Sequence, residues 1–126
     1  MKNWLLDTNA LIWYFTGSER MKPVQNLFSL PDTHVYISVV SWWEMAIKIR
    51  SGKLSINISQ LESFVKAYDF IELPLTKDHL PAYFNLPNLH KDPFDHMLLS
   101  QAITCPMRFI TGDAMLAEYS SLVMVV

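Results

Sequence analysis

Two aspartates in this chain stand directly behind short apolar stretches, a position at which α/β proteins commonly bind ligands. Asp7 follows the apolar run at 4–6, and Asp113 follows a strand predicted over 107–111, with one glycine between. A continuous apolar run indicates a strand buried on both faces, and open parallel sheets bind ligands at the carboxyl ends of their strands. Either aspartate could instead only cap the helix predicted after it. Two such corners are stronger evidence for a shared site than either alone.

A third carboxylate, Asp95, lies in the first turn of a helix predicted over 93–104. Its neighbours on the helix surface, three, four and seven positions later, are Leu98, Leu99 and Ala102. Asp95 is therefore predicted on the buried side of the helix. A favourable charge at the positive helix end would also explain an acid here, but Asp92 already occupies the N-cap position. We therefore predict a functional role for Asp95.

Glu44 gives a weaker signal. It shares one polar stripe with Ser41, Lys48 and Ser51, and Glu44 and Lys48 form an ordinary helical pair four residues apart. Spacing alone therefore predicts that Glu44 faces solvent. The same reasoning predicts a solvent-facing stripe on the helix 93–104, made of His96, Ser100, Gln101 and Thr104.

Other polar residues carry little specific signal. The histidines lack the spacing of metal ligands and are predicted in solvent or in polar loops: His34, His79, His90 and His96. Basic residues after the central helix are predicted to form a solvated patch that could also contact phosphates: Lys48, Arg50 and Lys53. Trp42 and Trp43 are predicted in the core rather than on a surface that stacks on bases, although one of the two could be exposed.

The composition indicates a folded domain without nucleotide-binding loops or disulfides. The chain has 126 residues, of which 51% are hydrophobic, and this predicts a single domain, 1–126, with a substantial core. With 3 glycines and no phosphate-loop pattern, nucleotide-binding loops are not expected. One cysteine excludes an internal disulfide, and the formal net charge of −2 counts mildly against nucleic-acid binding. No apolar stretch has the length of a signal peptide or membrane span, so we expect a cytoplasmic protein.

Predicted strands and helices alternate along the chain. Strands are predicted at 4–6, 35–38, 70–73, 107–111 and 122–126. Helices are predicted at 9–15, 19–30, 39–51, 59–68 with Ser59 as N-cap, 93–104 and 113–119, with a short or kinked helix after Thr76. This alternation predicts an α/β fold with a mostly parallel sheet covered on both faces.

Four stretches in this order resemble PIN-domain ribonucleases, the VapC-type toxins of bacterial toxin–antitoxin pairs. They are LDTNALIW at 6–13, ISVVSWWEMAIK at 37–48 with GKL at 52–54, HKDPFD at 90–95, and TGD at 111–113. Each motif alone is weak, but the four together span nearly the whole chain. The resemblance implies a three-layer α/β/α domain and a metal-dependent endoribonuclease that cleaves RNA. It also implies a small antitoxin as protein partner and a homodimer.

The resemblance further implies one Mg²⁺ or Mn²⁺ site formed by Asp7, Glu44, Asp95 and Asp113, and so it reverses the reading of Glu44 from spacing. Hard oxygen ligands of this kind suit either ion. Residues expected to orient the ligands or a water molecule are Thr8, Asn9, Ser38 and Thr111. Residues that would hold the RNA backbone are Lys48, Arg50, Lys53 and Lys91.

One departure from the family pattern affects the third motif, where relatives commonly have Arg after the acid and this chain has His96. The acidic centre is unaffected, but a phosphate or antitoxin contact through that side chain is not expected. Three other readings stay open. They are a PIN-type nuclease of RNA processing without an antitoxin, a catalytically silent PIN-like binding module, and a phosphatase resembling the haloacid dehalogenases. The phosphatase would need an aspartate at position 9, where this chain has Asn9.

Overall fold

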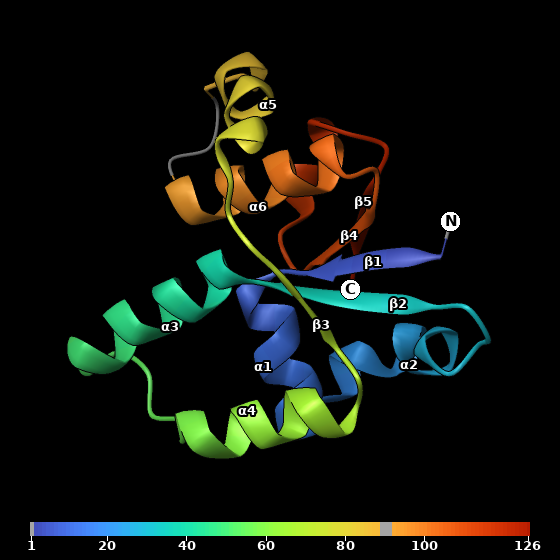
Figure 1. Cartoon of the computed structure of the whole chain (residues 1–126), viewed down its shortest axis with the longest axis vertical. Helices are drawn as coiled ribbons and strands as arrows, with labels where there is room; N and C mark the ends of the chain where they lie inside the picture. Colours follow the sequence, from blue (N-terminus) through green and yellow to red (C-terminus); the bar gives the residue numbers. More distant parts are fainter. Residues whose placement is uncertain (1, 89–91) are drawn as a thin grey trace.

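A five-stranded, wholly parallel sheet forms the centre of the protein in the computed structural model, which describes residues 2–88 and 92–126 (Figure 1). The strand order is β3-β2-β1-β4-β5. The strands are β1 (Asn3–Leu6), β2 (His34–Ser38), β3 (Ile71–Leu73), β4 (Arg108–Thr111) and β5 (Val123–Val125). The predicted α/β architecture is therefore confirmed.

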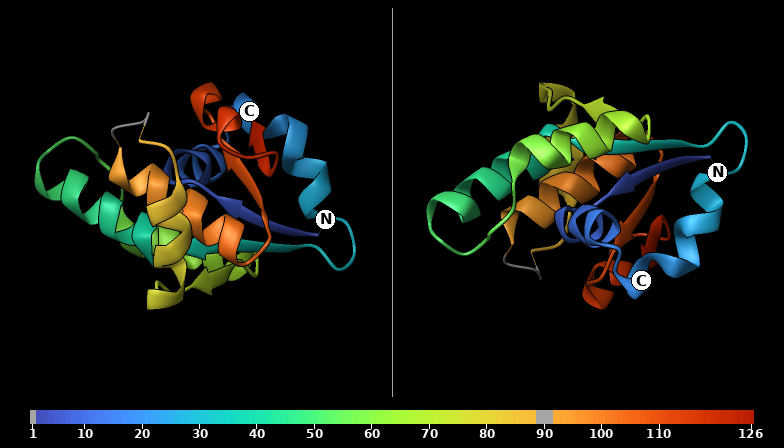
Figure 2. Two further views of the ribbon diagram at one scale, coloured as in Figure 1. Left: turned by 90° about the horizontal axis from the view of Figure 1, so that it is seen from above. Right: turned by 90° about the horizontal axis from the view of Figure 1, so that it is seen from below.

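Helices cover both faces of the sheet. They are α1 (Thr8–Thr16), α2 (Lys22–Phe28), α3 (Val39–Arg50), α4 (Ile58–Ala67), α5 (Leu80–Asn85) and α6 (Pro93–Thr104). Short 3₁₀ turns are η1 (Glu19–Met21), η2 (Lys77–His79) and η3 (Ala114–Glu118). The views from above and below show α5 and α6 on one side of the sheet and α1 and α4 on the other (Figure 2). Every helix in the described part of the chain is too short or too polar to cross a membrane.

Successive side chains of β1 point to opposite faces of the sheet and contribute to two hydrophobic cores. Leu6 points into a core shared with α1, α2 and α4, whereas the neighbouring Leu5 points into a core shared with α6. Both side chains are completely buried, as a strand covered on both faces requires. Helix α3 continues from the end of β2 and joins the layers, since Val40 belongs to the second core and Met45 to the first.

Local capping signals define most helix ends, with a few differences from the sequence prediction. The N-cap of α4 is Asn57, which accepts a hydrogen bond from the Gln60 amide at 3.1 Å, and the predicted cap Ser59 lies inside the helix. The helix predicted over 19–30 is divided into η1 and α2. The segment after Thr76 becomes η2 followed by α5, and Pro81 fits without a kink because it stands in the first turn of α5.

The polar stripe of α6 is buried, contrary to the prediction that it faces solvent. Only Thr104 is exposed, while Ser100 and Gln101 are completely buried and His96 is nearly so. The reason is that α6 packs between the sheet on one side and η2 and α5 on the other. His79 is also buried, in η2 against α6, rather than in solvent.

Gln101 uses this burial to join three segments. Its Oε1 accepts a hydrogen bond from the Ser38 hydroxyl at 2.5 Å, and its Nε2 donates to the Pro74 carbonyl at 3.2 Å. Ser38 is the N-cap of α3, and Pro74 directly follows β3. A buried amide with partners on both sides stabilises the helix on the sheet, whereas an unpaired one would be costly.

Candidate functional site

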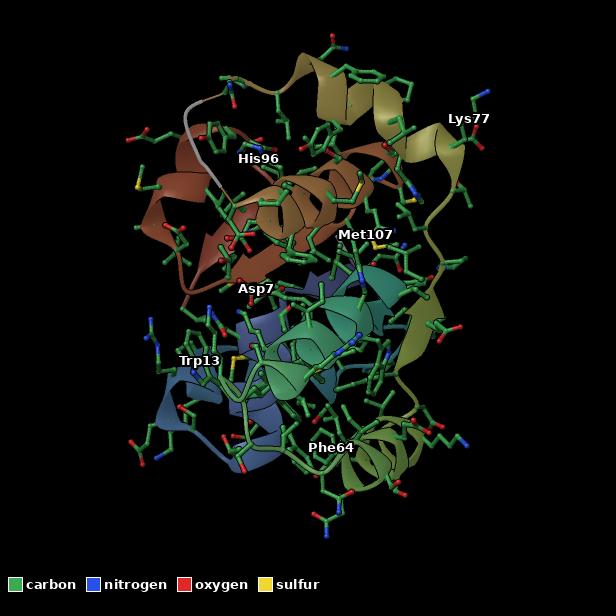
Figure 3. The ribbon with its side chains drawn as sticks, turned by 90° about the vertical axis from the view of Figure 1, so that its left-hand side faces the viewer. Asp7, Trp13, Phe64, Lys77, His96 and Met107 are labelled. Atoms are coloured by element: carbon green, nitrogen blue, oxygen red, sulfur yellow. The ribbon has the colours of Figure 1, made fainter. Side chains whose placement is uncertain are left out.

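Asp7 lies at the carboxyl end of β1, at the junction of the two helical layers (Figure 3). Its side chain caps α1, and Oδ1 accepts a hydrogen bond from the Ala10 amide at 2.7 Å. The residue is only 4% exposed. Burial raises the pKa of Asp7 to about 6, against hydrogen bonds from the Thr111 hydroxyl and the Ala10 amide that lower it. The negative charges of Glu44 and Asp113 raise this pKa further.

Asp113 occupies the neighbouring corner because β4 pairs with β1. It caps η3 by accepting a hydrogen bond from the Met115 amide at 3.0 Å. The Thr111 hydroxyl accepts from the Asp113 amide at 3.1 Å and hydrogen-bonds to the Asp7 carboxylate. Thr111 therefore connects the two acidic corners. Both aspartates are helix caps and both line one cleft, so a capping role does not exclude a shared site.

Glu44 is buried on α3, only 4% exposed, and the spacing-based prediction of a solvent-facing side chain is wrong. The Thr8 hydroxyl, which lies 3.0 Å from the Ser41 hydroxyl, donates to Oε1 of Glu44 at 2.5 Å. Lys48 approaches Oε2 at 2.6 Å. Helix spacing identified the Glu44–Lys48 pair, but the packing of α1 against α3 is what covers it.

A cleft of about 370 Å³ brings three of the four predicted acids together. Its lining consists of Asp7, Asn9, Trp13, Arg20, Asp95, Gly112, Asp113 and Ala114. Glu44 is not part of this lining, but its negative charge acts on Asp7, which is. The hydrogen bond to Glu44 raises the pKa of Lys48, which also feels the negative charges of Asp92 and Asp95. Lys48 therefore remains a cation among these carboxylates.

The donor set agrees with a divalent cation in its chemistry. All candidate ligands are carboxylate oxygens, which suit Mg²⁺ or Mn²⁺, and a nearby cation would relieve the cost of ionising buried Asp7. Across residues 2–88 and 92–126, however, no three carboxylate, imidazole or thiol groups stand close enough to hold an ion in their present positions. Binding an ion would therefore require the aspartates to turn toward one another.

The other predicted site residues fall into distinct places. Thr8 supports Glu44, Thr111 supports Asp7, and Asn9 lines the cleft. The Ser38 hydroxyl is engaged with Gln101 and with the Val40 amide. Arg50 and Lys53 are exposed at and beyond the end of α3, and Lys91 lies outside the described residues.

Sequence reasoning missed Arg20 and Trp13 as cleft residues. Arg20 follows the first helix in a polar stretch, and nothing in its spacing marks it as functional. Trp42 is half-buried and Trp43 is 58% exposed, so one of the two neighbouring tryptophans lies outside the core, as the sequence allowed. His96 packs with its ring edge-on to Tyr83 and Tyr119, at 6.1 and 5.8 Å between centroids.

Comparison with known proteins gives one family. The family model for the PIN domain matches residues 4–122. No curated protein gives a significant sequence match. Among solved structures, the chain is similar to VapBC2 from Rickettsia felis bound to a DNA fragment from its promoter. The TM-score is 0.78 with 14% identity, covering 98% of each chain.

Two further solved structures share this fold. The toxin–antitoxin complex from Klebsiella pneumoniae gives a TM-score of 0.68 with 21% identity, covering 96% of this chain and 95% of that one. DNA-bound VapBC from Salmonella typhimurium gives 0.70 with 16% identity, covering 100% of this chain and 98% of that one. At these identities the similarity shows the fold.

The raised pKa of Asp7 predicts a pH-dependent effect of Asp7→Asn on metal-free stability. A carboxyl that titrates at about 6 when folded and 3.8 in the unfolded chain favours folding below about pH 4, and this contribution is lost as pH rises to about 6. Asp7→Asn should therefore raise the free energy of unfolding in EDTA at pH 8, by up to about 3 kcal/mol. The gain should shrink toward pH 4.

Urea unfolding of both proteins at several pH values in EDTA measures this difference. The matched control is Asp69→Asn, at an exposed turn residue with φ of 56°, which asparagine also tolerates. A stability difference for Asp7→Asn that is absent at pH 8, or that does not change with pH, would contradict the prediction.

Proposed function

Because this chain belongs to the PIN domain family, we propose that it is a metal-dependent endoribonuclease and the toxin of a toxin–antitoxin pair. The observation that carries the proposal is the cleft in which Asp7, Asp95 and Asp113 meet at the carboxyl edge of the sheet. The structural similarity to a toxin–antitoxin complex from Klebsiella pneumoniae and to two VapBC proteins supports the biological role. A cytoplasmic location agrees with this role.

In the proposed site, Mg²⁺ or Mn²⁺ would be held by Asp7, Asp95 and Asp113, with Glu44 on the side of α3. Such an ion lowers the pKa of a bound water and offsets negative charge on the phosphoryl oxygens. The chain supplies the positioning: Thr111 orients Asp7, and Thr8 and Lys48 orient Glu44. Asn9 at the cleft wall can hydrogen-bond to a sugar or phosphate.

This proposal predicts RNA cleavage that requires Mg²⁺ or Mn²⁺ and the buried carboxylate. Asp7→Asn should lower the cleavage rate by at least about a hundredfold without unfolding the protein, because the side chain keeps its size and its cap. A gel assay with single-stranded RNA, with metal and with excess EDTA, measures this. Asp69→Asn is again the control and should keep full activity.

Metal binding is also expected to be visible without cleavage. Mn²⁺ at a hundred times its dissociation constant should stabilise the wild type by about 2.7 kcal/mol, and Asp95→Asn should lose this response in thermal melts. Cleavage that continues in EDTA, or in Asp7→Asn, would overturn the metal-dependent assignment. Wild-type melting that ignores both ions would do the same.

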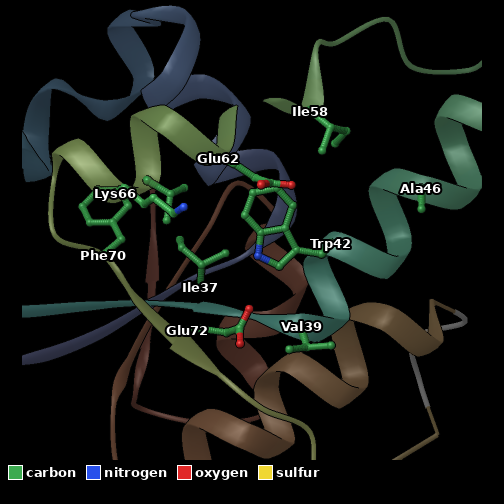
Figure 4. A pocket seen from close by; sticks show the side chains of 10 residues that line it. Ile37, Val39, Trp42, Ala46, Ile58, Glu62, Lys66, Phe70 and Glu72 are labelled. Atoms are coloured by element: carbon green, nitrogen blue, oxygen red, sulfur yellow. The ribbon is translucent and has the colours of Figure 1, made fainter. Parts of the chain in front are cut away.

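An apolar groove supplies a surface for the proposed antitoxin (Figure 4). It has a volume of about 600 Å³ and lies between α3, α4 and β3, with a largely apolar lining that includes Ile37, Val39, Trp42, Ala46, Ile58, Val65 and Phe70. Glu62, Lys66 and Glu72 border it. Because α3 carries both Glu44 and this lining, a peptide bound in the groove lies along the helix that supports the acidic cleft.

Introducing a charge into the groove should therefore block the antitoxin. Ala46 lines the groove but is exposed, so Ala46→Glu should leave folding and RNA cleavage intact. It should weaken binding of the small protein encoded beside this gene and prevent that protein from inhibiting cleavage. Ala67→Glu makes the same change at an exposed position outside the groove lining. Equal binding by both variants would place the antitoxin elsewhere, and absence of any binding protein would favour an RNA-processing nuclease.

A second apolar surface surrounds the start of α3 and supports the proposed homodimer. Trp43 is 58% exposed, stands edge-on to Phe94 at 5.2 Å between ring centroids, and lines a small depression with Leu75 and Met97. Exposed aromatic clusters of this kind are typical of protein interfaces.

Trp43→Glu should shift the purified protein from dimer to monomer, because the charge would be buried without a partner at the interface. Sedimentation or light scattering measures the mass. Leu30→Glu, at another residue that is 56% exposed, is the control and should leave the dimer intact. A wild type that is monomeric at high concentration would exclude the homodimer.

A further inference from the structure

Arg20 is held over the face of Trp13 at the wall of the acidic cleft. Its guanidinium carbon lies 4.1 Å from the centre of the indole ring, and Nη2 donates a hydrogen bond to the Val126 carbonyl oxygen at 3.0 Å. Both Arg20 and Trp13 line the cleft with the three aspartates. Stacking and hydrogen bonding together fix a side chain that would otherwise move freely, since Arg20 is exposed.

Gly112 explains how this pair comes so close to the acids. A Cβ added at Gly112 would lie 2.3 Å from Cη2 of Trp13 and 3.1 Å from Nη2 of Arg20. The indole ring therefore rests directly on the backbone between Thr111 and Asp113. A larger residue at 112 would push the ring and the guanidinium away from the second acidic corner.

The positive charge of Arg20 offsets the negative charge of the cleft. Three aspartates line it, and a polyanion such as RNA would be repelled by their charges. Of the described residues in its lining, only Arg20 is positively charged. Lys48, the other cation near these acids, is already paired with Glu44. One of the five N–H groups of Arg20 is used by Val126, which leaves others for a ligand.

We propose that Arg20, stacked on Trp13, binds a phosphate of the RNA strand next to the bond to be cleaved. A planar guanidinium matches two phosphate oxygens at once, and stacking prearranges it so that less side-chain entropy is lost on binding. This proposal rests on the proposed ribonuclease function and adds the residue that positions the substrate backbone.

Substrate binding without cleavage provides the test. A fluorescent, mixed-sequence single-stranded RNA is titrated into Asp95→Asn and into the same protein carrying Arg20→Gln, in Mg²⁺ at several NaCl concentrations. Arg20→Gln should weaken binding about tenfold, as expected for a charge-assisted contact. The slope of log affinity against log salt should fall by about 0.7, the value for one phosphate contact on a single strand. In the cleavage-competent protein, which keeps Asp95, Arg20→Gln should raise KM for the RNA and leave kcat nearly unchanged.

Lys2→Gln is the matched control, because it removes one positive charge beside the start of β1, far from the carboxyl edge that carries the cleft. It should change neither the affinity nor the salt slope. Arg20→Lys separates binding from a purely structural role. The lysine keeps the positive charge but loses the planar guanidinium. Arg20→Lys should therefore show the same salt slope as the protein with arginine at position 20, while binding RNA less tightly.

Other results would overturn the inference. Arg20→Gln binding RNA as tightly as Lys2→Gln would exclude the phosphate contact while leaving the ribonuclease proposal intact. If thermal melting shows that Arg20→Gln is unfolded, Arg20→Lys decides. If the RNA affinity of the Arg20 variants falls only as far as their melting temperatures do, the role of Arg20 is structural, through its hydrogen bond to Val126. Loss of antitoxin binding with unchanged RNA binding would assign Arg20 to a protein interface. Absence of both RNA binding and cleavage in the wild-type protein would defeat the ribonuclease proposal itself.

Discussion

A buried negative charge at the end of β1 is the constraint on which the site depends. Asp7 is 4% exposed, and its carboxylate can ionise at neutral pH only against the cost of desolvation. The fold meets part of this cost with the Ala10 amide and the Thr111 hydroxyl. Glu44, equally buried, receives the Thr8 hydroxyl and Lys48. Each carboxylate thus has fixed donors around it, and the combined negative charge favours a cation in the cleft.

The parallel sheet is what places these charges together. β1 is paired with β2 on one side and β4 on the other, so the chain leaves the sheet toward α1, α3 and η3 at adjacent positions. Asp7 is the first residue after β1, and Asp113 is the second residue after β4. Ser38 is the last residue of β2. Thr111 holds the two acidic corners in one hydrogen-bonded unit. An antiparallel order would send these corners to opposite ends of the sheet.

Rigid supports behind the cleft come from close packing. Gln101 ties α6 to the start of α3 and to the end of β3, and α6 in turn presents Asp95 from its first turn. On the other wall, the bare backbone at Gly112 admits the Trp13 ring, and the ring carries Arg20. The side chains of this cleft are therefore positioned by neighbours with little freedom to move, which suits the fixed geometry that the proposed RNA cleavage would need.

Local sequence determined most of the strands and helices, and it identified three aspartates that begin helices. Apolar runs defined the strands, and Asp7, Asp92 and Asp113 ended up as helix caps because a short carboxylate satisfies the free amides of a first turn. Tertiary structure decided what faced solvent. Helical spacing recognises one polar stripe, but it carries no information about whether a second layer covers that stripe. For this reason Glu44, His96 and Gln101 were predicted outside and lie inside. Arg20 became a cleft residue only through its contact with Trp13 at Gly112, which lies 92 positions later in the chain and has no local signal.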